Sequence, residues 1–125
     1  MVADVLRIAT KVANESRFLR ARVGACICKG GRILATGCNR IGFSKYLPDR
    51  HFPESIHAEQ QAILELLRER RLNDLVGSTI YVSRINNRGE PRLARPCGMC
   101  YKLIQSVGIS RIIFTTNEKD GIINV

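Results

Sequence analysis

Two short segments of the chain carry side chains that can bind a metal and move protons. One segment holds His57 and Glu59, two residues apart. The other holds Cys97 and Cys100, three residues apart. Imidazole nitrogen and thiolate sulfur are preferred Zn²⁺ ligands, and catalytic zinc sites use three protein ligands and keep one position open. One imidazole, two thiols and a nearby carboxylate therefore predict a catalytic zinc site.

Each half of this pattern also has another interpretation. Cys97 and Cys100 can form a redox Cys-x-x-Cys pair, or act as small buried hydrophobic side chains. A lone histidine at a helix start is often a surface residue, and Glu59 can simply complement the helix dipole. Only the two halves together favour zinc chemistry.

Two expected helices position these side chains. The first spans 56–70, and Ala62, Ile63 and Leu66 follow Glu59 at i+3, i+4 and i+7. The carboxylate therefore heads the apolar stripe of its own helix, where burial costs on the order of several kcal/mol unless a metal-bound water offsets it. The second helix spans 97–107, so both of its thiols lie near a helix N-terminus, which favours the metal-binding thiolate.

The remaining elements follow from periodicity and breakers. Gly30-Gly31 predicts a hairpin turn. The other expected elements are a helix over 3–14, strands over 23–28, 32–36, 79–82 and 111–116, and loops over 39–55 and 84–95. The tail 117–125 can add an edge strand, and the pattern leaves this open. This order predicts one three-layer α/β/α domain over 1–125 with a mixed sheet of about five strands.

The composition is that of a globular domain with a basic surface. Of 125 residues, 45% are hydrophobic, and 20 Lys+Arg against 11 Asp+Glu give a net charge of +9. Such a surface attracts phosphate, although many small basic proteins bind no specific anion. No apolar run is long enough to span a membrane and no signal peptide is recognised, so we expect a cytoplasmic protein (the host cytoplasm if viral). Five cysteines in a reducing compartment point to metal binding or catalysis.

The segments His57-Ala58-Glu59 and Pro96-Cys97-Gly98-Met99-Cys100 resemble the H-x-E…P-C-x-x-C signature of the cytidine deaminase superfamily. The resemblance runs from about Val23 to Thr116. Within the superfamily the chain is most similar to the deoxycytidylate deaminases, including phage-type members. The resemblance implies a cytidine deaminase-like fold and assembly as a homo-oligomer.

The resemblance also implies roles for individual residues. His57, Cys97 and Cys100 would hold one catalytic zinc ion, and Glu59 would be the proton shuttle. Zinc lowers the pKa of its bound water to about 7. Glu59 would pass the water proton to ring nitrogen N3, the hydroxide would attack C4, and Glu59 would then protonate the leaving amine, which turns cytosine into uracil. The substrate would contact Asn39, near the sugar, as well as Ala58 and Arg40.

Two departures from the family pattern bear on the substrate. The stretch 84–95 is longer and more basic than in compact relatives, and the chain ends soon after Thr116. Deamination of a free nucleotide such as dCMP is the leading hypothesis. The alternatives are a deaminase of single-stranded DNA or RNA, including a tRNA adenosine deaminase, and a non-catalytic zinc or nucleic-acid binding module.

Two further groups of residues invite a functional interpretation. The loop 39–55 interleaves cations with aromatic residues, which fits either a nucleotide lid or a loop anchored on the domain; they are Arg40, Phe43, Lys45, Tyr46, Arg50 and Phe52. The other cysteines and histidine of the chain do not form a convincing four-ligand set for a second metal; they are Cys26, Cys28, Cys38 and His51. We therefore expect small core thiols in place of a second zinc site.

Overall fold

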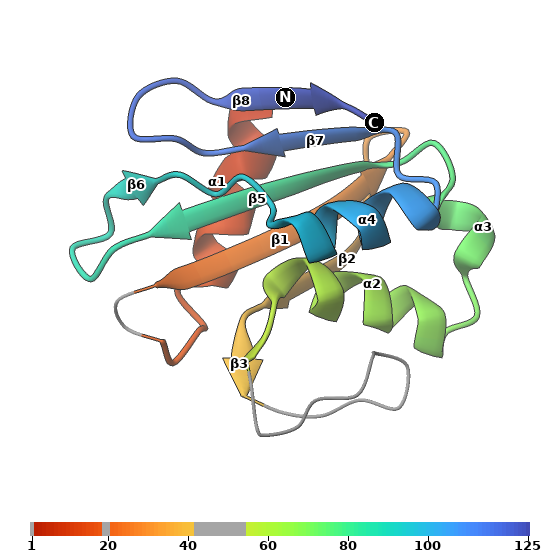
Figure 1. Ribbon diagram of the computed structural model, residues 1–125, viewed down its shortest axis with the longest axis horizontal. Helices are drawn as coiled ribbons and strands as arrows, with labels where there is room; N and C mark the ends of the chain where they lie inside the picture. The colour runs from red at the N-terminus through yellow and green to blue at the C-terminus, as the bar shows by residue number, and fades with distance from the viewer. Residues whose placement is uncertain (1, 19–20, 42–54) are drawn as a thin grey trace.

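The computed structural model describes residues 2–18, 21–41 and 55–125 (Figure 1). Its helices are α1 (Val2–Ala13), α2 (Ala58–Arg68), α3 (Leu72–Leu75) and α4 (Gly98–Ser106). Its strands are β1 (Arg22–Lys29), β2 (Arg32–Cys38), β3 (Arg40–Ile41), β4 (Ser55–Ile56), β5 (Thr79–Ile85), β6 (Pro91–Arg92), β7 (Arg111–Phe114) and β8 (Gly121–Asn124). None of the helices in these ranges has the length and apolar character needed to cross a membrane.

Six of the strands form one mixed sheet. Five follow the order β2-β1-β5-β7-β8, and β6 pairs with the end of β5. β5 and β7 are parallel, and the other neighbouring pairs of this sheet are antiparallel. The α4 crossover between β5 and β7 is the connection that a parallel pair requires. The mixed sheet confirms the predicted fold class.

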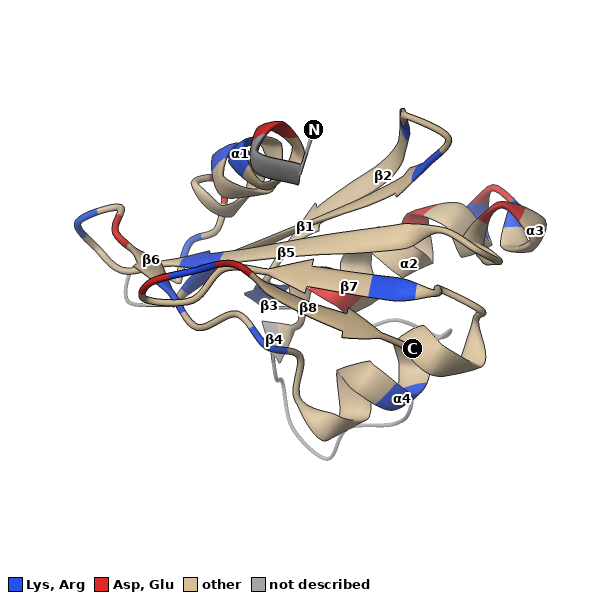
Figure 2. Cartoon of the chain, turned by 90° about the horizontal axis from the view of Figure 1, so that it is seen from above, with Lys and Arg blue, Asp and Glu red and all other residues tan. Residues whose placement is uncertain are grey.

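Helices cover both faces of this sheet. Figure 2 shows α1 on one face and α2 and α4 on the other. Alternation along β1 separates the two sides: Ala25 and Ile27 belong to the cluster under α2 and α4, whereas Cys26 and Cys28 belong to the cluster under α1. The predicted three-layer arrangement is therefore present.

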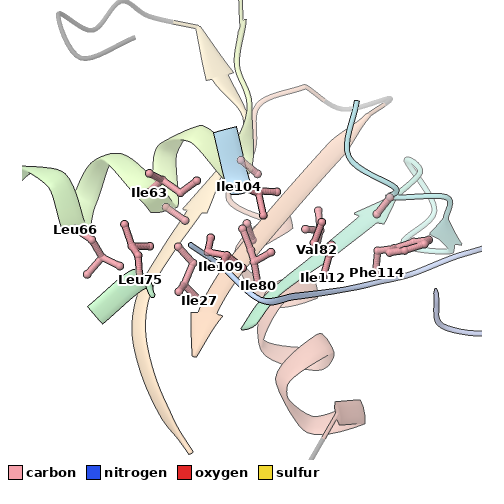
Figure 3. Packing of buried hydrophobic residues seen from close by; sticks show 14 residues of the cluster. Ile27, Ile63, Leu66, Leu75, Ile80, Val82, Ile104, Ile109, Ile112 and Phe114 are labelled. Carbon is pink, nitrogen blue, oxygen red and sulfur yellow. The ribbon is translucent and has the colours of Figure 1, made fainter. Parts of the chain in front are cut away.

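The larger core lies between the sheet and the helices that carry the expected metal ligands (Figure 3). Ile63 and Leu66 from α2 and Ile104 from α4 are at most 1% exposed, and they pack in one cluster with side chains of β1, β5 and β7. Burying a side chain of this size stabilises the fold by about 1.5–3 kcal/mol. This shared core holds α2 and α4 against the same face of the sheet.

The two helices also start at the same end of the molecule. Figure 1 shows the first turns of α2 and α4 close together, each on the side of its helix that faces the β5–β6 hairpin. Gln60, which is 1% exposed, connects the two starts, because its Nε2 donates to Sδ of Met99 at 3.9 Å. Its Oε1 accepts from the backbone N–H of His57 at 2.9 Å. The first turn of α2 is thus tied both to its own cap and to α4.

Several predicted boundaries are wrong, because strand pairing includes residues that the sequence pattern assigns to a helix or a loop. Ile56 pairs with Arg40 in a two-stranded sheet, so α2 begins at Ala58 and not at 56. Arg84 and Ile85 extend β5 because they pair with β1 and β6, so 84–92 forms a hairpin, whereas 93–95 is irregular as predicted. The tail supplies edge strand β8, and α3 was not predicted at all. The aromatic residues of the expected lid lie outside the described residues.

We predict that Gly37→Ala destabilises the protein by about 1–3 kcal/mol, the usual effect of overpacking. A Cβ on Gly37 would lie 2.6 Å from the backbone nitrogen of Ala62 and 2.8 Å from the carbonyl oxygen of Ala58. Because these are backbone atoms of α2, the helix itself must move away from β2. Denaturant unfolding measures the effect. Gly98→Ala is the control, because its added methyl meets nothing within 4 Å; equal stability of the two variants would contradict the prediction.

Candidate active site

Two helix caps bring the expected metal ligands together. His57 is the N-cap of α2 and Cys97 is the N-cap of α4, each with an extended backbone. Nδ1 of His57 lies 3.2 Å from Sγ of Cys100 and 3.8 Å from Sγ of Cys97. Ligand atoms of all three residues lie within 4.8 Å of one another, although 40 positions separate His57 from Cys97 in the chain.

The geometry of this cluster fits one zinc ion. Tetrahedral zinc with bonds of about 2.1 Å to nitrogen and 2.3 Å to sulfur holds these atoms about 3.6 Å apart. The two nitrogen–sulfur distances, 3.2 and 3.8 Å, lie on either side of that value. Within the described residues the cluster gains no fourth histidine, cysteine or acidic ligand. Three donors match a site that keeps one position for a reacting molecule.

Glu59 lies in the first turn of α2, beside the cluster in sequence and buried in space. Its side chain is only 5% exposed. Burial raises the pKa of Glu59 from 4.5 to about 7, and a hydrogen bond from its own backbone opposes that rise. A bound divalent cation favours the ionised form and acts in the same direction as that hydrogen bond. A carboxyl group that exchanges its proton near neutral pH suits general acid–base work.

A pocket of about 270 Å³ joins these groups. His57, Ala58, Glu59 and Cys97 contribute to its wall, and Asn39 contributes from the end of β2. The residues that surround the pocket thus include two of the three expected ligands and the expected proton shuttle. A small planar ring that entered it would meet the metal cluster and the buried carboxylate together.

Asn39 is fixed in that wall by the backbone of the preceding segment. Its Oδ1 accepts from the N–H of Val23 at 3.0 Å, and its Nδ2 donates to the carbonyl of Ala21 at 2.7 Å. Arg40 does not line this pocket. It lines a neighbouring hollow that also includes Asn39 and Arg17. Of the expected substrate-binding residues, the structure therefore brings Ala58 and Asn39 to the pocket and places Arg40 beside a different one.

Sequence reasoning missed six of the residues that line the pocket, among them two arginines. Arg84, Leu93 and Arg95 line it, and they come from the end of β5 and from the segment that leads into α4. The excess of arginines over 84–95 was the available signal. It did not distinguish the arginines that reach the pocket from those that do not, because that depends on how the hairpin folds back.

The remaining cysteines lie elsewhere. Cys26 and Cys28 pack with Leu6, Ala9 and Tyr81 under α1, and their sulfurs are 3.8 Å apart. They share a face of β1, as expected from strand alternation. His51 lies outside the described residues.

The family is decided by comparison with known sequences. The profile of the cytidine and deoxycytidylate deaminase zinc-binding region matches residues 2–116. The chain belongs to this family. Deoxycytidylate deaminase of Mycobacterium phage D29 is 31% identical over 128 residues, which cover 87% of this chain and 89% of that protein. Zinc is the metal of this family, and the three-ligand cluster is suited to one such ion.

Solved structures share the deaminase fold. The dCMP deaminase of cyanophage S-TIM5 superposes with a TM-score of 0.64 and 22% identity, covering 90% of this chain and 80% of that chain. Cytidine deaminase from Burkholderia pseudomallei superposes with a TM-score of 0.69 and 18% identity, covering 98% and 91%. At these identities the likeness concerns the fold alone.

We predict that His57→Ala and Cys100→Ala proteins lose zinc on dialysis against a chelator that leaves about one ion per chain in the wild type. Each variant removes one of three ligands, so the remaining pair binds more weakly. Elemental analysis of the dialysed proteins gives the ratio. Cys38→Ala serves as a thiol control, because Cys38 lies outside the cluster. Full zinc content in both ligand variants would refute this assignment.

Proposed function

We propose that this protein is a zinc-dependent hydrolytic deaminase that converts dCMP to dUMP and ammonia. The observation that carries the proposal is the three-ligand His57, Cys97 and Cys100 cluster with a buried acid, Glu59, in the wall of the same pocket. A structural zinc site or a redox dithiol explains neither the buried carboxyl nor the pocket. The membership of the deaminase family supports the same conclusion.

The residues divide the chemistry between binding a metal and moving protons. His57, Cys97 and Cys100 would hold a zinc ion, which would supply a Lewis acid that lowers the pKa of water to about 7. Glu59 accepts the proton of the attacking water and delivers it to N3 of the cytosine ring. Once the water oxygen has bonded to C4, Glu59 takes the remaining proton of that hydroxyl and gives it to the exocyclic amine. The C4–N bond then breaks, a carbonyl remains at C4 and the amine leaves as ammonia. The low exposure of Glu59 keeps bulk water from taking over these transfers.

Backbone and amide groups of the pocket suit the rest of the substrate. The N–H of Ala58, in the first turn of α2, has no acceptor within the helix and suits a carbonyl oxygen on the base. Asn39 uses one amide hydrogen on Ala21 and has a second one for a sugar oxygen. Arg40 stays a predicted substrate contact, through the adjoining hollow.

A free nucleotide is the substrate that the observations favour. The phage relative at 31% identity is a deoxycytidylate deaminase. A structure of the S-TIM5 enzyme contains dCMP and dUMP. The net charge of +9 and the two pocket arginines suit a substrate that carries a phosphate.

A polynucleotide substrate is the second candidate, because the hairpin carries positive charge beyond the pocket. Arg88 and Arg92 lie on the hairpin but are absent from the described lining of the pocket. Figure 2 shows blue segments along this hairpin. Such charges can contact phosphates on either side of a flipped base.

We further propose that the protein acts in the cytoplasm (the host cytoplasm if viral) and assembles as a homo-oligomer. The large apolar side chains of Leu72 and Val76, at the end of the molecule that carries α3, are 52% and 58% exposed. Apolar surface of this kind is covered when subunits associate.

We predict that Glu59→Gln keeps the zinc ion and the fold but lowers kcat about 10²–10⁴-fold, the usual contribution of a general acid–base group. Glutamine matches the shape of glutamate and cannot carry the proton. Ammonia release from dCMP, with zinc content measured in parallel, is the assay. Glu65→Gln is the matched control on the same helix, because its carboxylate pairs with Arg68 at the surface. Wild-type turnover in Glu59→Gln would rule out the mechanism.

We predict that the protein deaminates dCMP and that turnover at low substrate falls only a few-fold from 50 to 200 mM salt, since one phosphate is bound. A single strand held through about three phosphates would weaken about twentyfold over that range. The assay compares dCMP with DNA and RNA oligomers at both salt concentrations. Activity confined to oligomers would exclude the free nucleotide and establish the second candidate.

A further inference from the structure

We infer that Arg84 and Arg95 form a clamp for the 5′-phosphate of the nucleotide and thereby select nucleotides over nucleosides. This inference rests on the proposed function and extends it to the residues that read the phosphate. It concerns the basic stretch 84–95, which holds Arg84, Arg88, Arg92 and Arg95.

The two arginines are the cations of the stretch 84–95 that reach the pocket. Both line it together with His57 and Glu59, and both are exposed enough to meet a ligand at its mouth. Neither guanidinium forms an ion pair within the described residues. Arg92, by contrast, lies 3.5 Å from Glu90 and is partly neutralised by it.

A buried hydroxyl holds the two segments that carry these arginines. Thr115 is 7% exposed and follows β7 directly. Its Oγ1 accepts from the backbone N–H of Arg84 at 3.1 Å and donates to the carbonyl of Arg92 at 2.8 Å. Its carbonyl accepts from the N–H of Ala94 at 2.9 Å. Thr115 therefore joins the end of β5 to the segment that leads to Arg95. It lies where one edge of β5 stops pairing with β7 and starts pairing with β6.

The turn of the hairpin is equally well defined. Oδ1 of Asn86 accepts from the backbone N–H groups of Arg88 and Glu90, each at 2.9 Å. The carbonyl of Asn86 accepts from Nη2 of Arg22 at 3.1 Å, which ties the turn to the start of β1. The hairpin is thus an ordered support, so the backbone that carries Arg84 is fixed before a ligand arrives.

Phosphate is the anion that two such side chains fit. A guanidinium stays charged at all working pH values and presents paired N–H donors that match phosphate oxygens. In the proposed function the metal cluster and Glu59 act on the base, which leaves the arginines of the same pocket for the phosphate of the substrate. A nucleoside lacks the anion and leaves both cations without a partner.

Binding of the product provides the test, because it requires no turnover. Calorimetry on the zinc-loaded protein measures Kd for dUMP and for deoxyuridine. We expect Arg84→Gln and Arg95→Gln each to lower the ratio of nucleoside Kd to nucleotide Kd about tenfold, the usual effect of losing a hydrogen bond to a charged group. Arg88→Gln, from the tip of the same hairpin, is the matched control and leaves the ratio unchanged. An unchanged ratio in both pocket variants overturns the inference.

Thr115 provides an independent check as a positioning residue. Thr115→Val keeps the side-chain shape but removes both hydroxyl bonds, and we expect it to lower the same ratio. Thr116→Val is its control, because that hydroxyl bonds to the carbonyl of Lys119 and not to the hairpin. A general loss of stability lowers nucleoside and nucleotide binding together, so it does not move the ratio.

Two outcomes separate this inference from the proposed function. If the protein deaminates dCMP but substitution of Arg84 and Arg95 does not change the ratio, the proposed function stands and the clamp is wrong. If the substitutions lower the ratio but the protein does not deaminate dCMP, the clamp stands and the proposed function is wrong. A dinucleotide with a 5′-phosphodiester is the third ligand. If the two substitutions weaken the dinucleotide more than dUMP, the clamp reads a strand and not a free nucleotide, which overturns the inference.

Discussion

The structure depends on the approach of two helix starts to within bonding reach of one ion. Nδ1 of His57 and Sγ of Cys100 lie 3.2 Å apart, although they belong to α2 and α4. Metal–ligand bonds tolerate errors of only a few tenths of an ångström, so both helices need firm support. Gly37 lets α2 lie directly on β2, the common core holds both helices to one face, and Gln60 connects their first turns.

Burial of Glu59 has an electrostatic cost. Glu59 is only 5% exposed, and this burial raises the free energy of its ionised form. The pKa of Glu59 therefore rises to about 7. A divalent cation beside it removes much of that penalty. A metal ion bound by the cluster and the ionised acid would therefore stabilise each other.

The basic hairpin shows how a charge excess becomes a set of placed charges. In the sequence, the four arginines over 84–95 are equivalent. In the fold, β5 and β6 pair and Thr115 bridges the break between β6 and β7. Only Arg84 and Arg95 then line the pocket, while Arg92 is drawn toward Glu90. Position, and not the total of +9, decides which charges can meet a substrate.

The sequence by itself determined the ligand types, their local spacing and the alternation of helices and strands, because these depend on neighbours in the chain. It predicted the mixed sheet and the residues of the metal cluster. Only the tertiary structure decided which distant groups meet. It placed Arg40 beside another hollow, brought Arg84 and Arg95 to the pocket and made strands of 84–85 and 121–124. Those outcomes depend on pairing across the sheet, which no local pattern encodes.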